Sequence, residues 1–140
     1  YEYNSYMLST VPGDPHVVWA MVTSPLFSNY NGVVDKYLES IGANDSLVTV
    51  MPYNDFLIDR NGRPINCAYG HWHLLTQELQ EAYQISGAAY IAKKSDQLEW
   101  RYWIGLKPQL FEISKLEAIE VDYPSDFQIA EALFHNLLND

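Results

Sequence analysis

Cysteine, positive charge and long apolar runs are all scarce in this sequence, and each scarcity excludes a class of protein. Cys67 stands alone, which excludes an intrachain disulfide and a cysteine cage for a metal. Eight basic residues against 18 acidic ones give a formal net charge of −10, which argues against nucleic acid and anionic membranes as partners. No apolar run reaches the roughly 20 residues of a membrane span. Since no secretion signal is visible either, the reducing cytoplasm is the expected location.

Familiar catalytic signatures are missing as well. The sequence has no Walker loop, no dinucleotide fingerprint and no Gly-x-Ser-x-Gly motif. His71 and His73 alternate around Trp72, but no third ligand follows at a recognisable spacing, which disfavours a zinc site. Neither a cysteine nor a serine nucleophile therefore has a motif to support it.

The pattern that is present predicts an α/β domain covering residues 1–140. Hydrophobic residues make up 48% of the chain and charged residues 19%, which suits one globular core. The apolar runs at 17–22 and 47–51 predict strands buried on both faces, the kind found in parallel sheets. Helical spacing predicts a helix over 28–41, with Gly42 as its stop. Residues 87–92 predict a third core strand beside the other two.

Two further regions have their own patterns. Short strands are expected at 109–113 and 118–121, followed by a helix with Ser125 and Gln128 as a capping box. The apolar stripe expected on that helix is Ile129, Leu133, Phe134 and Leu137. An insertion at about 53–80 carries Asn61-Gly62, the signal of a tight hairpin turn. Its aromatic, alternating character predicts contact with a second subunit.

Candidate ligand-binding residues follow the expected strands, because ligands of open α/β sheets bind beyond the carboxyl ends of strands. Thr23 and Ser24 offer hydroxyls to a nucleotide, or else form a turn stiffened by proline. Glu120 and Asp122 face the same way on an extended chain and suit Mg²⁺, or else they offset the dipole of the following helix. The amide of Gln77 can donate to and accept from a sugar or base, or simply be solvated.

Three segments, taken in order, resemble the CMP-sialic acid synthetase (acylneuraminate cytidylyltransferase) family. They are residues 22–26, residues 76–79 with 87–91, and residues 111–127. The resemblance implies a three-layer fold of the nucleotide-diphospho-sugar transferase type with a mostly parallel sheet, a β-hairpin dimerisation insertion and a homodimer. It also implies a Mg²⁺-dependent reaction in which a hydroxyl of sialic acid, or a related nonulosonate, attacks CTP and releases pyrophosphate.

The resemblance also assigns roles to individual residues. Glu120 and Asp122 fall on the family's metal-binding and catalytic Asp-x-Asp, with Glu in place of the first Asp. Thr23 and Ser24 fall at the nucleotide. The expected sugar-binding residues are Gln77, Gln84 and Tyr90, with Gln84 standing where the family carries an arginine that binds the acidic sugar.

One part of the family pattern is not found in this chain. The strand and loop rich in Arg, Ser, Lys and Gly that wraps the nucleotide phosphates has no counterpart, so the fold is expected to be N-terminally truncated. Two hypotheses follow from this. The chain is either the C-terminal portion of a cytidylyltransferase, with little activity alone, or a non-catalytic module that binds a nucleotide or sugar or dimerises.

Overall fold

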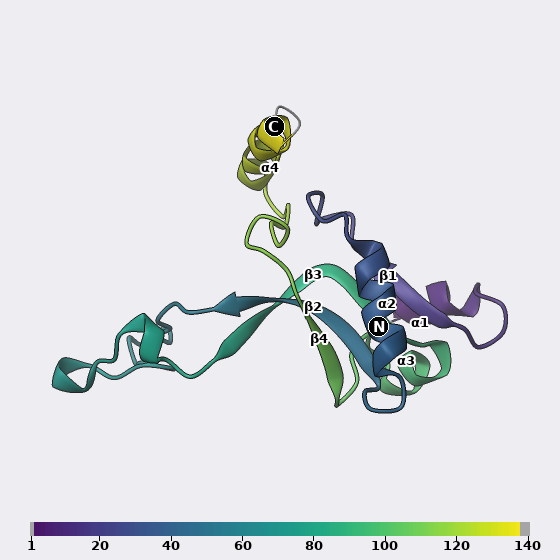
Figure 1. Cartoon of the computed structure of the whole chain (residues 1–140), viewed down its shortest axis with the longest axis horizontal. Helices are drawn as coiled ribbons and strands as arrows, with labels where there is room; N and C mark the ends of the chain where they lie inside the picture. The colour runs from purple at the N-terminus through teal and green to yellow at the C-terminus, as the bar shows by residue number, and fades with distance from the viewer. Residues whose placement is uncertain (1, 138–140) are drawn as a thin grey trace. The chain divides into compact units, whose positions relative to one another are not determined.

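The computed structural model describes residues 2–137, and four strands and four α-helices make up most of it (Figure 1). In chain order the elements are α1 (Glu2–Ser9), β1 (His16–Ala20), α2 (Tyr30–Ser40), β2 (Ser46–Tyr53), β3 (Ala82–Lys93), α3 (Lys94–Trp100), β4 (Pro108–Glu112) and α4 (Pro124–Leu137). Two short 3-10 helices, Gly70–Trp72 and Thr76–Glu78, lie between β2 and β3. None of the helices in this described part is long and apolar enough to cross a membrane.

The strands form one sheet in the order β1-β3-β2-β4, which confirms the α/β class. The β1–β3 pair is antiparallel, with His16 opposite Lys93 and Ala20 opposite Ala89. The β2–β4 pair is parallel. The sheet is therefore mixed, whereas a mostly parallel sheet was expected. The three strands predicted at 17–22, 47–51 and 87–92 are neighbours, with β3 between β1 and β2.

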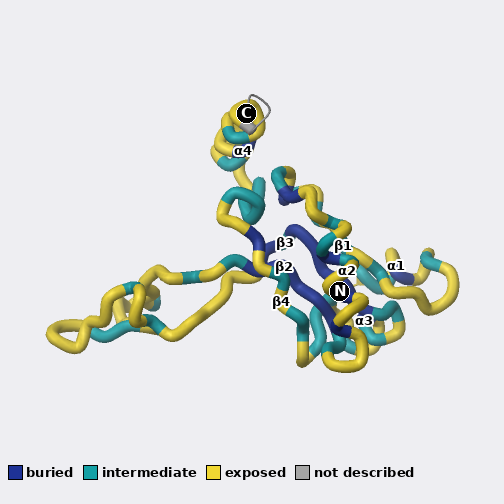
Figure 2. The backbone as a smooth tube through the Cα atoms, viewed as in Figure 1, coloured by how far each residue is buried: buried dark blue, intermediate teal, exposed yellow. Residues whose placement is uncertain are grey.

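Alternation along the strands divides the core between the two faces of the sheet. On one face, Val33 and Tyr37 of α2 pack with Leu47 and Ile91. On the other face, Val48, Val50 and Tyr90 pack against Trp19, Met21, Trp103 and Ile104. Figure 2 shows the buried residues concentrated along β2 and β3. Helix α2 begins after Asn29, whose side chain accepts from Gly32 N, and Gly42 follows its end with φ at +91°, as predicted for the stop.

Strand β1 is the clearest correction to the sequence prediction. It ends at Ala20, and its residues alternate between exposed and half-buried instead of being buried on both faces. The reason is its position at the edge of the sheet: α2 packs against the region of β2, β3 and β4, and Val18 on that face of β1 stays 41% exposed. An apolar run reports the composition of a strand but not which strands lie beside it.

Contacts along the chain separate the molecule into two compact units. The first contains Tyr1–Met51 and Ile85–Asp140, and the second contains Pro52–Gln84. In the second unit, the expected hairpin turn is present: Ile58 bridges Pro64, Asp59 N donates to Arg63 O at 2.8 Å, and Gly62 has φ at +78°. The side chain of Asp59 also accepts from the backbone N–H groups of Asn61 and Arg63, which favours an aspartate two residues before Asn61.

Candidate functional site

The loop after β1 and the segment before α4 lie side by side. Val121 N donates a hydrogen bond to Thr23 O at 2.7 Å, although the two residues are far apart in the sequence. This bond brings the predicted nucleotide-binding loop, Thr23 and Ser24, to the same place as the predicted carboxylate segment, Glu120 to Asp122. The segment 118–121 is not the expected strand, because it pairs with a loop and not with the sheet.

Glu120 is held by a residue that sequence reasoning did not assign to the site. Its Oε1 accepts a hydrogen bond from the backbone N–H of Gly87, which lies in β3. A Cβ at position 87 would overlap this oxygen and would approach Met21 Cγ to 3.8 Å. Glycine at 87 therefore leaves the space that the Glu120 carboxylate occupies. An isolated glycine inside an apolar strand pattern was the available signal, since it often marks the close approach of another group.

Tyr90 lies close enough to this carboxylate to be affected by its charge. Only 8% of Tyr90 is exposed, and its ring stacks on Trp103 with centroids 5.3 Å apart. Burial raises the pKa of Tyr90 to about 12, with smaller contributions from the charge of Glu120 and from Tyr102. The phenol therefore stays protonated at neutral pH and can donate as well as accept. Its contact with a sugar stays a prediction.

Ser24 sits in a tight turn that backbone bonds already hold. Ser24 N donates to Met21 O at 3.1 Å, and Phe27 N donates to Ser24 O at 3.4 Å. The side chain is 2% exposed, and its Oγ has no hydrogen-bond partner within residues 2–137. A buried hydroxyl without a partner costs about 1–3 kcal/mol. The turn alone therefore does not account for a serine here, whereas a bound ligand or water would.

Asp122 is exposed and lies two residues before the start of α4 at Pro124. The helix start is served by another carboxylate: Asp126 Oδ2 accepts from Tyr123 N at 2.8 Å and from Asp122 N at 3.1 Å. The predicted Ser125–Gln128 capping box is wrong, because the helix begins at Pro124 and Ser125 lies within its first turn. Proline at the first helical position with an acid two residues later was the signal for this start. Since Asp126 already caps the helix, the role of dipole compensation does not require Asp122.

The two predicted metal ligands, Glu120 and Asp122, are both carboxylates. Within the described residues, no group of three or more His, Cys, Asp or Glu is placed to hold a metal ion. Protein side chains of the described residues therefore do not form a complete set of metal ligands at this end of the sheet. Mg²⁺ does not need one, because it takes one or two carboxylates and completes its shell with water and substrate phosphates. Glu120 has its second oxygen and Asp122 its exposed carboxylate for such a role, so the donor set fits Mg²⁺.

Two of the predicted sugar-binding residues belong to the other unit. Gln84 is the last residue of the second unit, Pro52–Gln84, and Gln77 lies in the 3-10 helix Thr76–Glu78 of the same unit. The exposed side chain of Gln77 lines a small cavity of about 340 Å³ together with Asn54, Thr76, Leu79 and Glu81. The structure thus groups Thr23, Ser24, Glu120 and Tyr90 within one unit and leaves the two glutamines in the second.

Comparisons with known proteins give one informative result. No protein-family model and no curated protein matches the chain. Among solved structures, the fold is similar to the crystal structure of 4-diphosphocytidyl-2C-methyl-D-erythritol synthase from Anaerococcus prevotii, with a TM-score of 0.61 and 14% sequence identity. The match covers 94% of this chain but only 64% of that chain, so this chain spans less than two thirds of the length of the neighbour. The likeness shows the fold alone: the chain shares the α/β fold of that synthase.

Proposed function

We propose that the chain is part of a CTP-dependent cytidylyltransferase whose nucleotide lies where Thr23 and Ser24 meet Glu120. The observation that supports this most directly is the hydrogen bond from Val121 N to Thr23 O, which joins the two candidate segments at one end of the sheet. In the proposed reaction, an acceptor oxygen attacks the α-phosphorus of CTP, the bond to the β-phosphate oxygen breaks, and pyrophosphate leaves. Catalysis of such a step depends on positioning and on neutralising charge.

Each residue has a distinct part in this proposal. Mg²⁺, held by Asp122 and the second oxygen of Glu120, would supply positive charge at the phosphates. Gly87 N–H fixes the orientation of Glu120, so that only one of its oxygens is left for the ion. The unpartnered hydroxyl of buried Ser24 would donate to the nucleotide.

Two observations limit the chemical class of the molecule that would accept the cytidylyl group. The sequence resemblance favours a nonulosonate, whose hydroxyl would receive the cytidylyl group. The fold neighbour is named for a diphosphocytidyl product. A diphosphate arises when CMP is transferred from CTP onto an acceptor that already carries a phosphate. Gln84, a neutral amide, cannot pair bidentately with a sugar carboxylate as an arginine does. We therefore propose that the acceptor is either a nonulosonate bound without that arginine or a sugar phosphate.

A homodimer completes the proposal. Nine large apolar or aromatic residues of the second unit are more than a third exposed: Phe56, Leu57, Ile58, Ile65, Tyr69, Trp72, Leu74, Leu75 and Tyr83. A segment of this size cannot bury so much apolar surface by itself. Contact with a second copy would bury it, and static light scattering would detect the dimer. A monomer at high concentration would contradict this assignment.

A second function, nucleotide binding without transfer, is favoured by the state of the basic residues. Four basic residues lie at the end of β3 or follow it in the sequence: Lys93, Lys94, Arg101 and Lys107. Lys93 Nζ forms a salt bridge with Asp14 at 2.8 Å. Lys94 Nζ donates to Val11 O at 2.6 Å and to Gly13 O at 3.1 Å. Since these two lysines hold the turn before β1, they are poorly placed to neutralise a departing pyrophosphate.

One pair of assays separates the two functions. Calorimetric titration with CTP, with and without Mg²⁺, measures binding, and pyrophosphate release with a panel of nonulosonates and sugar phosphates measures transfer. We expect Mg²⁺-dependent CTP binding and little or no transfer by the 140-residue chain, because Lys93 and Lys94 are engaged at the turn before β1 and the leaving group needs positive charge beside it. The same titration of Asp122→Ala tests the proposed metal ligand, and Asp35→Asn on the exposed surface of α2 is its control for loss of charge. Absence of CTP binding would refute both functions, and robust transfer would refute the non-catalytic one.

A further inference from the structure

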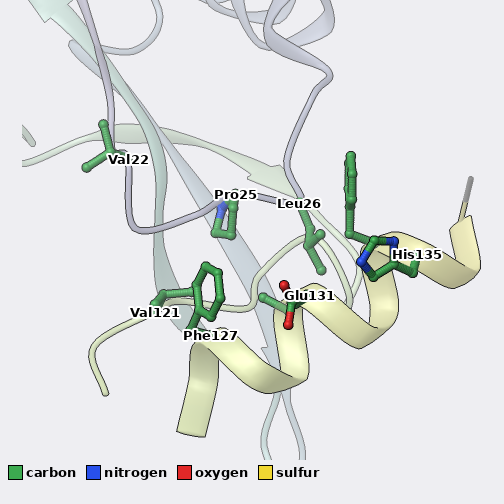
Figure 3. A pocket seen from close by; sticks show the side chains of 9 residues that line it. Val22, Pro25, Leu26, Val121, Phe127, Glu131 and His135 are labelled. Carbon is green, nitrogen blue, oxygen red and sulfur yellow. The ribbon is translucent and has the colours of Figure 1, made fainter. Parts of the chain in front are cut away.

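Helix α4 and the loop after β1 flank an apolar cavity that the proposed reaction does not use. Its volume is about 500 Å³, within the usual range for sites of small molecules (Figure 3). Val22, Pro25 and Leu26 line it from the loop, and Phe127 and Phe134 line it from the helix. All of these residues belong to the first compact unit, so the cavity is formed within one unit.

The wall that α4 contributes follows from helical spacing. Phe127, Glu131 and Phe134 are four and three residues apart, so their side chains project from one face of the helix. Phe127 is 56% exposed, Phe134 48% and Val22 across the cavity 95%, so packing within the described part of the chain leaves this surface uncovered. Exposed apolar surface that is gathered in a cavity indicates a binding site.

A single carboxylate gives this cavity its charge. Of the nine lining residues, only Glu131 and His135 are polar. Figure 3 shows the carboxylate of Glu131 beside Leu26, with His135 one helical turn further along α4. Within residues 2–137, no lysine or arginine lines the cavity and none pairs with this carboxylate. A negative charge on an apolar wall attracts a positively charged ligand.

We propose that this cavity binds a small organic cation in which an ammonium group is attached to an apolar or aromatic body. The ammonium group pairs with Glu131, and the apolar body packs against Phe127, Phe134 and the loop after β1. The two phenyl rings add to the attraction, because the faces of aromatic rings attract cations. The net charge of −10 also favours a cation over an anion. A neutral apolar molecule would leave Glu131 unpaired, and a carboxylic acid would be repelled by it.

The cavity adjoins the candidate nucleotide site along the backbone. Val22 and Pro25 flank Thr23 and Ser24, and Val121, which also lines the cavity, donates to Thr23 O at 2.7 Å. A bound cation would therefore contact residues next to both segments of that site. Its binding requires neither CTP nor Mg²⁺, so the cavity can be tested independently of the proposed transfer reaction.

Three probes that share a phenyl ring on a butyl chain separate the effect of charge from that of apolar contact: phenylbutylammonium, phenylbutanol and phenylpentanoate. Each is titrated into the 140-residue chain at low ionic strength, and binding is followed by the NMR shifts of the backbone amides. We expect phenylbutylammonium to shift the amides of Val22, Val121 and Phe127. It should bind about fivefold more tightly than phenylbutanol, which is the upper range for one exposed ion pair. Phenylpentanoate should bind more weakly than phenylbutanol, because Glu131 repels it.

Two variants of the charged residues show whether Glu131 causes the preference. Glu131→Gln should make the affinities for phenylbutylammonium and phenylbutanol equal and leave the binding of phenylbutanol unchanged. Asp35→Asn, on the exposed surface of α2, is the matched control and should keep the fivefold difference.

A second pair of variants tests the same cavity without changing α4. Val22→Lys places a positive charge in the cavity and should reverse the preference, so that phenylpentanoate binds more tightly than phenylbutylammonium. Leu106→Lys is its matched control, because Leu106 is fully exposed and lies outside the cavity, and it should keep the preference for the cation.

Four results would overturn the proposal. The three probes could bind with equal affinity, Glu131→Gln could leave the preference for the cation unchanged, or the shifts could fall on residues away from the cavity. The fourth result is an affinity for phenylbutylammonium that falls as the protein concentration rises, because a second copy of the chain would then occupy the cavity.

Discussion

The hydrogen bond between Gly87 and Glu120 can be tested by a double-mutant cycle whose sign changes with background. In the wild-type chain, Gly87→Ala pushes the Glu120 carboxylate away, because the new Cβ overlaps its Oε1. The lost hydrogen bond to a charged acceptor costs about 1.5 kcal/mol, the lower end of the usual range, since Glu120 is half-buried. Replacing glycine by alanine within a strand raises the free energy of unfolding by about 0.5–1 kcal/mol, because the unfolded chain loses conformational freedom. The net expectation is a loss of about 0.5–1 kcal/mol in the free energy of unfolding.

The same substitution should stabilise a chain that lacks the carboxylate. In Glu120→Ala, the nearest remaining atom to a Cβ at 87 is Met21 Cγ, at an ordinary 3.8 Å. Gly87→Ala should then raise the free energy of unfolding by about 0.5–1 kcal/mol. The coupling between the two positions is therefore about 1.5 kcal/mol, well above the few tenths seen for independent sites.

Urea unfolding of the four proteins, followed by far-UV circular dichroism, measures this cycle. Equal m-values across the series would show that the comparison is valid. If Gly87→Ala destabilises both backgrounds by the same amount, the glycine serves the backbone of β3 and not the carboxylate. That result would remove the reason for regarding Glu120 as a positioned ligand.

Three further expectations concern charge. Asp122→Ala should abolish Mg²⁺-dependent CTP binding in calorimetry with the fold intact; if Asp122 only offsets the helix dipole, the change would instead be about 0.3–1 kcal/mol of stability. Burial raises the pKa of Tyr90 to about 12 from 10.0, so its contribution to stability is complete below pH 10 and is lost as pH rises towards 12. Tyr90→Phe should flatten that alkaline loss in pH-dependent unfolding, although Tyr37, whose pKa is also raised by burial, keeps part of it. The hydrogen bond from Lys93 lowers the pKa of Asp14 below 3.8, so this pair stabilises the turn above that pH and stops doing so as pH falls. Asp14→Asn should show no such acid dependence of the free energy of unfolding. An unchanged dependence on pH in that variant would contradict the role of the pair.

Sequence reasoning succeeded where burial is periodic and local. Val33 and Tyr37 recur at helical spacing and are buried in α2, and the apolar run around Val48 is the buried strand β2. The Asn61-Gly62 turn formed as expected, because left-handed backbone at Gly62 is a local property. The helix α4 was also foreseen, although its start was misassigned to Ser125.

The sequence predicted which residues form the candidate site but not the contacts that bring them together. Thr23, Ser24 and Glu120 were each chosen for their place after a strand, and the structure brings them to one end of the sheet through Val121 N and Thr23 O. Whether they bind a nucleotide or Mg²⁺ stays a proposal.

The sequence by itself determined which segments are apolar, where helices and turns form, and which polar side chains follow the strands, because these depend on neighbours along the chain. Tertiary structure alone decided that β1 is an edge strand, that Gly87 holds Glu120 across 33 residues, and that Ser24 is buried without a partner. Strand order and contacts between distant segments depend on how whole elements pack, and the same apolar run serves equally well in the middle of a sheet or at its edge.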